Sequence, residues 1–418
     1  MNHAPAPDVI VAGAGPAGAA AARTLAAGGA SVLLVERAHF PRNKPCGGGL
    51  TTRALRRFPW IAKPLAGIDV HPIATLELES PDGSRLSLSA NEPVGLLVRR
   101  VEFDHALVRE AQQAGAQLHD GFEIAQASVD AGGVTLTSRT GETLRARSVV
   151  AADGVHSVIA KRLGVNARWP ADAIAIDMME ETPVETLRAA RPDVVWVSYA
   201  YQGLDGYAYI FPKTHHVNIG IGCLLSHFKD AVPDRPYELQ SKLVSSLVGS
   251  GALEGRSDRR QFTPYLIPVG GPLPTAYSGP VLFAGDAGGF VNGFTAEGIY
   301  YAMISGELAG RAILATRGRP LDAGPYYARS WHKEIRRELL DSVAIQKYLF
   351  RNHTRVDRAV RGGKAFPWLA EAIIDYAIGR RSYGDVRRRV FFRAPGAALR
   401  LVWRTMMDGR MRRAAATT

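Results

Sequence analysis

The sequence predicts an α/β fold, in which a parallel-sheet domain carries an inserted antiparallel β-sheet and is followed by a helical C-terminal region. Residues 8–36 read as strand, glycine turn, helix and strand. Residues 69–97 and 172–280 alternate polar and apolar side chains, as half-buried antiparallel strands do. From residue 321 onward, apolar side chains recur at helical spacing among many arginines.

The first element is a strand at Val9–Ala12, which is apolar and largely β-branched, as suits a buried parallel strand. It leads into Gly13, Gly15 and Gly18 in the pattern G-x-G-x-x-G. The first glycine permits a tight turn, the second lets a pyrophosphate approach the backbone, and the third lets the helix pack close to the strand. The second strand ends at Glu36, whose carboxylate can bind a ribose hydroxyl. This segment predicts a dinucleotide site in a Rossmann-like domain.

A glycine-rich loop follows the second strand. The stretch Lys44-Pro-Cys-Gly-Gly-Gly-Leu50 has no hydrophobic period, so we expect a loop, with a helix after Thr51. Because this loop can reach back over the nucleotide site, the backbone of Gly47–Gly49 is expected to face something flat or charged. The alternative is a flexible surface turn.

Two later strands end in acidic residues. A buried strand ends in Asp153-Gly154, and an apolar strand ends in Gly285-Asp286. Because Asp286 ends a strand, its carboxylate can accept hydrogen bonds from sugar hydroxyls; alternatively, it caps a helix. These strands are expected at 148–152 and 280–284, and helices at 100–114, 236–248 and 296–315.

The order of the glycine turn, Arg100, Asp153-Gly154 and the Asp286 motif resembles the FAD-binding flavoprotein superfamily that includes the aromatic hydroxylases. The resemblance implies that Asp286 contacts the ribityl chain and that Arg100 lies near the flavin and pyrophosphate. The Asp153 motif is linked there with both FAD and the nicotinamide donor. The FAD contacts expected are Gly13, Gly15, Ala17, Gly18, Glu36, Arg37, Cys46, Gly47, Gly48, Arg100, Asp153, Gly285, Asp286, Gly298 and Ile299.

Three stretches, 44–50, 206–212 and 291–301, resemble more narrowly the geranylgeranyl reductase family, and the resemblance extends to about residue 315. That family reduces isolated isoprenoid double bonds with reduced FAD. Departures from its usual pattern, which bear on the substrate more than on the chemistry, are Gly293 in place of Pro, Ala296 in place of Gly, and Tyr209 in place of Trp.

Such a reduction needs a hydride, a proton and a dry apolar site shaped to a long chain. Tyr209, Phe211 and Phe294 are the candidate substrate contacts, although they suit an ordinary sheet core as well. The candidate catalytic residues are Tyr207, Cys46 and Glu297. The thiol of Cys46 can donate a proton or simply fill a small buried site, and Glu297 can instead satisfy free N–H groups at a helix start.

The net charge of +12 is concentrated at the C-terminal end. From residue 327 onward there are 21 Lys and Arg against 8 Asp and Glu, whereas the preceding residues carry 30 against 31. Apolar residues at helical spacing in 368–376 and 399–406, with arginines at 387–393, suit an anionic membrane surface. The alternative is that these stripes pack on the body. No nucleic-acid-binding module appears, and no oligomeric state is indicated.

The two cysteines, Cys46 and Cys223, form no disulfide framework and no metal site, which suits a reducing compartment, and Cys223 is expected in the core. We find no signal peptide and no spanning segment. We therefore expect a cytoplasmic protein, with peripheral association at the inner face of the cell membrane as the alternative left open. A single G-x-G-x-x-G means that the electron donor is transiently bound NADPH or a ferredoxin-type protein.

The function expected is FAD-dependent reduction of an isoprenoid chain. The substrate classes open to it are geranylgeranyl diphosphate, a prenylated lipid, a quinone side chain and a pigment phytyl precursor. An FAD monooxygenase or halogenase is the alternative, and a non-catalytic flavin-binding membrane protein is the third possibility. The expected division is an FAD-binding domain at 1–68, 98–171 and 281–320, a substrate domain at 69–97 and 172–280, and a basic helical region at 321–418.

Overall fold

The glycine turn lies in the middle of a six-stranded sheet. In the computed structural model, which describes residues 6–317 and 319–393, the strand order of this sheet is β20-β21-β12-β1-β2-β8. The central strands run parallel, as their apolar sequences predict, and only the β20–β21 pair is antiparallel. The strands are β1 (Val9–Ala12), β2 (Val32–Glu36), β8 (Gln117–Asp120), β12 (Ser148–Ala151), β20 (Tyr277–Ser278) and β21 (Val281–Phe283).

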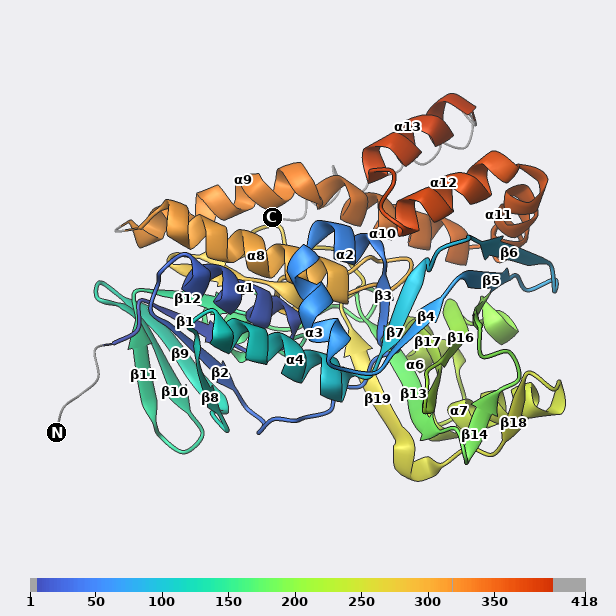
Figure 1. The fold of residues 1–418 in the computed structure, drawn as a ribbon, viewed down its shortest axis with the longest axis horizontal. Helices are drawn as coiled ribbons and strands as arrows, with labels where there is room; N and C mark the ends of the chain where they lie inside the picture. The colour runs from blue at the N-terminus through green and yellow to red at the C-terminus, as the bar shows by residue number, and fades with distance from the viewer. Residues whose placement is uncertain (1–5, 318, 394–418) are drawn as a thin grey trace.

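Helices cover one face of this sheet and a small sheet covers the other (Figure 1). The alanine-rich helix α1 (Pro16–Ala27) packs between α8 (Ile299–Ala315) and α4 (Arg100–Gln113). α8 begins three residues later than the sequence predicts, because the chain at Ala296 has a left-handed φ of 54°. The small sheet consists of β9 (Ile124–Asp130), β10 (Gly133–Ser138) and β11 (Thr143–Ala146).

The second large sheet has seven strands and is largely antiparallel. It draws strands from both alternating stretches of the sequence, and β5 pairs with β15 in parallel rather than antiparallel fashion. In spatial order it contains β19 (Phe262–Ile267), β13 (Ala175–Pro183), β17 (His216–Leu224), β16 (Gly206–Pro212), β15 (Val194–Tyr199), β5 (Thr75–Glu79) and β6 (Arg85–Ser89). The helices α6 (Leu225–Ala231) and α7 (Pro236–Gly249) and the pair β14 (Leu187–Ala189) and β18 (Leu253–Gly255) accompany this sheet. Cys223 is buried in its core, as expected.

Part of the glycine-rich stretch forms a strand, where the sequence predicts a loop. β3 (Gly49–Thr51) pairs with β7 (Gly95–Val98), which also pairs with β4 (Val70–Ile73). A three-residue strand is too short to show a hydrophobic period. β3 forms because its partner strand provides the hydrogen bonds. The helix expected after Thr51 is short: α2 (Arg53–Arg57) is followed by α3 (Ala62–Ala66).

The described part of the C-terminal region, which ends at Arg393, is largely helical, as predicted. α9 (Ala323–Glu334) and α10 (Arg336–Phe350) lie along the body, and α11 (Thr354–Ala365), α12 (Pro367–Ala377) and α13 (Tyr383–Arg393) gather beyond β6 (Figure 1). α12 corresponds to the apolar stripe at 368–376, and its Ala372 is fully buried against the body. The stripe at 399–406 lies outside the described residues. Among the described helices, none has both the length and the apolarity required to cross a membrane.

Candidate active site

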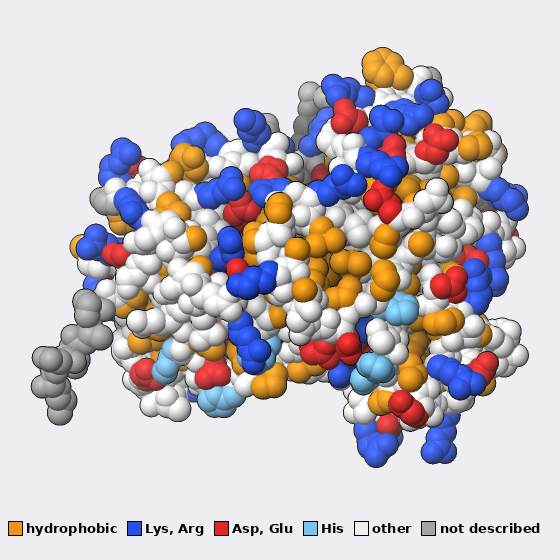
Figure 2. Space-filling model, in the orientation of Figure 1, with side chains coloured by type: hydrophobic (Ala, Val, Ile, Leu, Met, Phe, Trp, Pro, Cys, Tyr) orange, Lys and Arg blue, Asp and Glu red, His pale blue; other side chains and the backbone are white. Residues whose placement is uncertain are grey.

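A cavity of about 600 Å³ lies between the two sheets, and it joins the glycine turn to an apolar wall. Its polar end is formed by the turn after β1, the glycine-rich loop and the segment around Asp286. Its apolar end is formed by β5, β15 and β16 of the seven-stranded sheet and by α12. Figure 2 shows hydrophobic side chains gathered in a hollow near the centre of the face, in the area of β3 and β7 in Figure 1.

The carboxylate of Glu36 lies directly beside the glycine turn. Its Oε2 accepts a hydrogen bond from the backbone N–H of Ala14 at 3.0 Å and lies 3.3 Å from Nη2 of Arg42. A Cβ at Gly15 would meet only Arg42, at 3.9 Å, so the backbone there is open toward the cavity. The first turn of α1 also presents its N–H groups at this end, where an anion is favoured. The arrangement fits the ribose and pyrophosphate of a dinucleotide.

Two arginines are held at the cavity by one buried carboxylate. Nε of Arg100 lies 2.7 Å from Oδ1 of Asp104, and Nη1 of Arg42 lies 2.7 Å from Oδ2. Burial alone would raise the pKa of Asp104, but Arg100 and Arg42 lower it below its ordinary value. Asp104 therefore stays charged and fixes both guanidinium groups in place.

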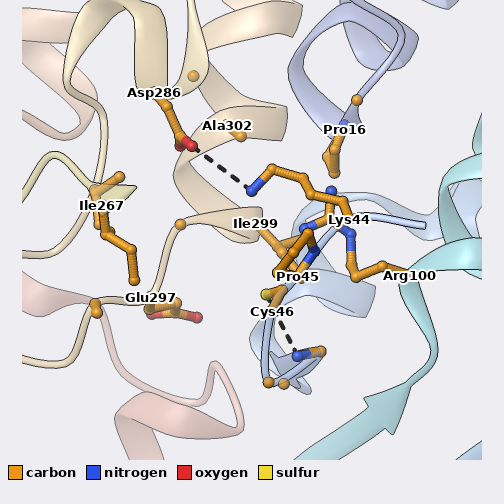
Figure 3. A pocket seen from close by; sticks show the side chains of 18 of the residues that line it. Pro16, Lys44, Pro45, Cys46, Arg100, Ile267, Asp286, Glu297, Ile299 and Ala302 are labelled. Carbon is orange, nitrogen blue, oxygen red and sulfur yellow. Dashed lines mark hydrogen bonds and ion pairs between the residues drawn. The ribbon is translucent and has the colours of Figure 1, made fainter. Parts of the chain in front are cut away.

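Lys44 and Asp286 point toward one another across the cavity (Figure 3). Nζ of Lys44 lies 3.8 Å from Oδ2 of Asp286 and 4.3 Å from the centroid of the Tyr265 ring. Lys44 follows β2 and Asp286 follows β21, so the loop reaches across the carboxyl ends of the intervening strands. This is the edge of a parallel sheet at which ligands bind.

Asp153 is placed at the same edge, and one of its oxygens is unsatisfied. Its Oδ2 accepts a hydrogen bond from the backbone N–H of Ile159 at the start of α5 (Val158–Arg162). Its Oδ1 is buried without a protein partner, and burial raises the pKa of this carboxyl. An unpaired buried acceptor is costly, so Asp153 fits a site in which a ligand hydroxyl completes its hydrogen bonding.

The glycine-rich loop packs directly on the seven-stranded sheet. A Cβ at Gly47 would lie 2.8 Å from Cδ2 of Phe211, so a larger residue would displace the loop from β16. Next to it, Sγ of Cys46 accepts the backbone N–H of Gly48 at 3.4 Å, and the thiol also interacts with Arg100. The loop thus places a thiol beside a cation at the cavity wall.

Glu297 belongs to a buried charged cluster centred on Arg53. Nη2 of Arg53 lies 2.5 Å from Oε2 of Glu297, and Nη1 lies 3.0 Å from Oε1 of Glu338 on α10. The hydroxyls of Tyr301 on α8 and Tyr376 on α12 also donate to Glu338. The cluster joins α2, α8, α10 and α12 behind the cavity wall, so Glu297 is an ion-paired residue at this wall.

The structure brings nearly all the expected site residues to one cavity. Gly18 does not line it, because this glycine packs against the carbonyl of Gly13 inside the turn. Phe294 does not line it either: its ring stacks on Tyr199 at 5.0 Å and borders a smaller neighbouring cavity. The expected residues that do line it are Gly13, Gly15, Ala17, Glu36, Arg37, Cys46, Gly47, Gly48, Arg100, Asp153, Tyr207, Tyr209, Phe211, Gly285, Asp286, Glu297, Gly298 and Ile299.

Several lining residues escaped the sequence analysis. Ile373 and Tyr376 of α12 close the cavity from a helix that the sequence only showed to be amphipathic. Asp177 lies buried in the cavity wall, and the one signal for it was a single charge inside the apolar stretch AIAIDMM. Arg42 was likewise missed, because no spacing rule marks an arginine in an irregular loop.

Ala296 lines the cavity with a left-handed φ of 54°, at the position where the resembling family commonly has glycine. A left-handed conformation costs a non-glycine residue roughly 1–2 kcal/mol. We expect Ala296→Gly to raise the free energy of unfolding by about 1 kcal/mol. Relief of the strain should exceed the cost of the extra conformational entropy that glycine gives the unfolded chain. Urea denaturation of the two proteins measures the change, and a destabilised variant would contradict it.

Comparison with known proteins agrees with this architecture. The model of the FAD binding domain family matches residues 6–304. Digeranylgeranylglycerophospholipid reductase from Methanocella arvoryzae is 31% identical over 350 residues, which cover 80% of this chain and 84% of that protein. Menaquinone reductase from Mycobacterium tuberculosis is 30% identical over 332 residues, which cover 73% and 76%.

Among solved structures, a geranylgeranyl bacteriochlorophyll reductase-like protein from Thermoplasma acidophilum superposes with a TM-score of 0.78. It is 19% identical, and the match covers 95% of this chain and 98% of that one. The flavin-dependent brominase Bmp2 superposes with a TM-score of 0.69 at 18% identity, covering 89% and 93%. At these identities the likeness shows the fold alone.

The fold and the site therefore define an FAD-dependent oxidoreductase built like the aromatic hydroxylases. More narrowly, the chain belongs to the FAD binding domain family and, within it, to the geranylgeranyl reductase family. The fold class, the family and the enzyme class predicted from the sequence are confirmed.

Proposed function

We propose that the protein hydrogenates isolated C=C bonds of an isoprenoid chain with reduced FAD. The observation that carries this proposal is the apolar continuation of the nucleotide cavity. The wall is apolar: it is formed by β5 and β15, and Ile373 of α12 closes it. The strand residues are Leu76, Leu78, Val195 and Val197. Such a wall suits a flexible hydrocarbon chain and excludes water from the reacting carbon atoms.

The residues present fit FAD at the polar end of the cavity. Glu36 would bind the ribose, Arg42 and the start of α1 the pyrophosphate, Asp286 the ribityl chain, and the glycine-rich loop the flavin ring. Reduced FAD supplies a hydride when bound. The chain itself would hold the alkene, exclude water and provide the proton. The division into FAD-binding, substrate and C-terminal regions is part of this proposal, as is the choice between NADPH and ferredoxin as electron donor.

An FAD-dependent monooxygenase or halogenase is the second candidate, because a brominase shares this fold. The two functions differ in their need for oxygen. We would photoreduce the bound flavin without air, add geranylgeranyl diphosphate and then, separately, a menaquinone. Flavin reoxidation with a product heavier by pairs of hydrogen atoms supports the reductase. Absence of anaerobic reoxidation, together with substrate-dependent oxygen consumption, supports the monooxygenase.

The same anaerobic assay identifies the electron donor. NADPH and a reduced ferredoxin are each mixed with the oxidised enzyme, and flavin bleaching is followed with time. Rapid bleaching by one donor and not by the other assigns it.

Cys46 is the candidate proton source that the sequence offers, and Cys46→Ala tests it. If the thiol donates or relays the proton, FAD binding stays normal and turnover falls by about 100-fold, the usual size of a lost general acid. Flavin fluorescence measures binding, and anaerobic product formation measures turnover. Cys223→Ala, at a core thiol away from the cavity, is the matched control. Full turnover in Cys46→Ala would remove the thiol from the mechanism.

We also propose that the C-terminal helices dock on an anionic membrane surface. Phe366 and Phe392 are exposed, and Phe392 is 78% exposed at the end of α13. Lys and Arg side chains gather over α12 and α13 (Figure 2). Exposed aromatic and basic side chains on one surface suit lipid headgroups. Because α12 also closes the cavity, docking here would place a lipid chain near its entrance.

Sedimentation with vesicles tests this docking. We expect binding to phosphatidylglycerol vesicles that weakens with added salt, and roughly 10-fold weaker binding for Phe392→Ser, from the lost burial of one aromatic ring. Leu321→Ser, at an apolar residue that is 68% exposed outside these helices, is the control. Equal binding to neutral phosphatidylcholine vesicles would exclude the electrostatic contribution.

A further inference from the structure

Asp177 and Tyr209 meet inside the cavity across an intervening strand. Asp177 lies on β13 and Tyr209 on β16, and β17 runs between them. The hydroxyl of Tyr209 donates to Oδ2 of Asp177 at 3.1 Å. Both residues line the cavity, and they are only 7% and 4% exposed.

Two glycines of β17 make this contact possible. Gly220 is the direct register partner of Tyr209, and Gly222 is the partner of Asp177. A Cβ at Gly220 would lie 2.3 Å from the Tyr209 hydroxyl oxygen, so the tyrosine ring lies over the bare backbone of this strand. The hydrogen bond therefore requires the side chains from β13 and β16, and it also requires that β17 has no side chain at the two facing positions.

The surroundings keep a proton on the pair near neutral pH. Burial raises the pKa of Asp177 to about 7, even though the hydrogen bond from Tyr209 and the charge of Lys44 oppose this rise. Tyr207 also faces the pair, and the Lys44 ammonium lies over the ring of Tyr265 on β19. Lys44 can therefore stabilise the carboxylate once the proton has left.

We propose that Tyr209, and not the Cys46 thiol, is the proton donor of the reaction and that Asp177 is the positioning residue behind it, which returns a proton to the tyrosine. The inference rests on the proposed function. It also gives a role to the tyrosine that stands where the resembling family commonly has tryptophan, a side chain without a hydroxyl group.

The π bond of the alkene breaks, one carbon receives the hydride supplied with reduced FAD, and the other receives the proton of the Tyr209 hydroxyl. Asp177 passes its proton to Tyr209 as the tyrosine loses its own. The carboxylate that remains is faced by Lys44 and is reprotonated from solvent before the next turnover.

Kinetics of the FAD-loaded enzyme test the pair with Asp177→Asn and Tyr209→Phe. We expect kcat to fall by about 100-fold or more in both variants, with KM changed by less than about threefold. In the wild type, kcat falls as the pH rises above 7, because Asp177 loses its proton. This limb disappears in Asp177→Asn.

A measurement without substrate tests the pair independently of the function. The infrared difference spectrum between the wild type and Asp177→Asn, both loaded with FAD, should show a protonated carboxyl that titrates near pH 7. In Tyr209→Phe the midpoint should move upward, because the hydrogen bond that lowers the Asp177 pKa is lost. If no alkene is reduced by the wild type, the proposed function fails, whereas this titration still reports on the pair.

Glu180→Gln is the matched control. Glu180 is a fully buried carboxyl on the same strand, but it points to the opposite face of the sheet and bonds to Ser257. It should leave both the pH limb and the carboxyl signal in place. The proposal is overturned if Asp177→Asn keeps the alkaline limb, if no carboxyl titrates near neutrality, or if Asp177→Asn loses FAD while Glu180→Gln retains it.

Discussion

Replacing Arg53 with methionine is expected to lower the free energy of unfolding by about 3–5 kcal/mol, the usual loss when one partner of a buried ion pair is removed. The Arg53 side chain is 5% exposed and pairs with both Glu297 and Glu338. Its guanidinium also lies 3.9 Å from the ring centroid of Tyr300 and 4.2 Å from that of Tyr376. Methionine fills part of the volume but leaves two carboxylates without this cation.

The loss should depend on pH. Burial raises the pKa of Glu338 even with Arg53 present, and removal of the cation raises it further. When a carboxyl has a higher pKa in the folded protein than in the unfolded chain, stability falls as the pH rises from the unfolded-chain pKa toward the folded-state pKa. The variant should therefore lose more stability at pH 8 than at pH 5, because protonation of Glu338 as the pH falls relieves the unpaired buried charge.

Urea denaturation at both pH values measures this effect, and Arg56→Met is the control. Arg56 lies on the same short helix, but its side chain is 52% exposed and it pairs with Glu92 at 3.8 Å. An exposed pair of this kind contributes about 0–1 kcal/mol. Equal stability of Arg53→Met and Arg56→Met at pH 8 would show that the buried cluster does not stabilise the fold.

The Arg53 cluster also shows where inference from the sequence ends. The glycine turn, β1, α1 and Glu36 were predictable, because their signal lies within about 30 consecutive residues and each residue type has a local physical reason. The cluster joins side chains from four helices and one loop, and Arg53 and Glu338 are 285 positions apart in the chain. No local pattern reports such a partnership.

The same limit applies to the cavity wall. Alternation predicted the strands β13, β16 and β17, but not their order in space. That order brings Asp177 and Tyr209 to the two sides of β17. Apolar spacing predicted α12, but it did not show that Ile373 and Tyr376 face a cavity rather than a core. Short strands such as β3 show no hydrophobic period, so the sequence predicts a loop there. Site residues on local motifs were thus found, whereas those brought in by tertiary packing were missed.

Replacing Gly13 with alanine is expected to abolish retention of FAD and to lower the free energy of unfolding by about 2–4 kcal/mol. Gly13 has a φ of 94°, which strains an L-amino acid with a side chain. A Cβ there would lie 2.3 Å from the carbonyl oxygen of Ala152 and 3.0 Å from Cα of Asp153. Alanine must therefore push the end of β12 away from β1, at the edge of the sheet that is proposed to bind the cofactor.

Gly15→Ala separates this structural effect from loss of contact with the cofactor. Gly15 has an ordinary φ of −78°, and a Cβ there would project into the cavity with only Arg42 within 4 Å. The apo-protein should keep its stability, while flavin fluorescence should show weaker FAD binding. Gly249→Ala, at the last residue of α7 with no atom within 4 Å of the added Cβ, should change neither quantity. If Gly13→Ala retained FAD as tightly as Gly249→Ala, the close approach of β1 to β12 would not be needed to form the nucleotide site. If Gly15→Ala retained it as tightly, the pyrophosphate would not lie against this backbone.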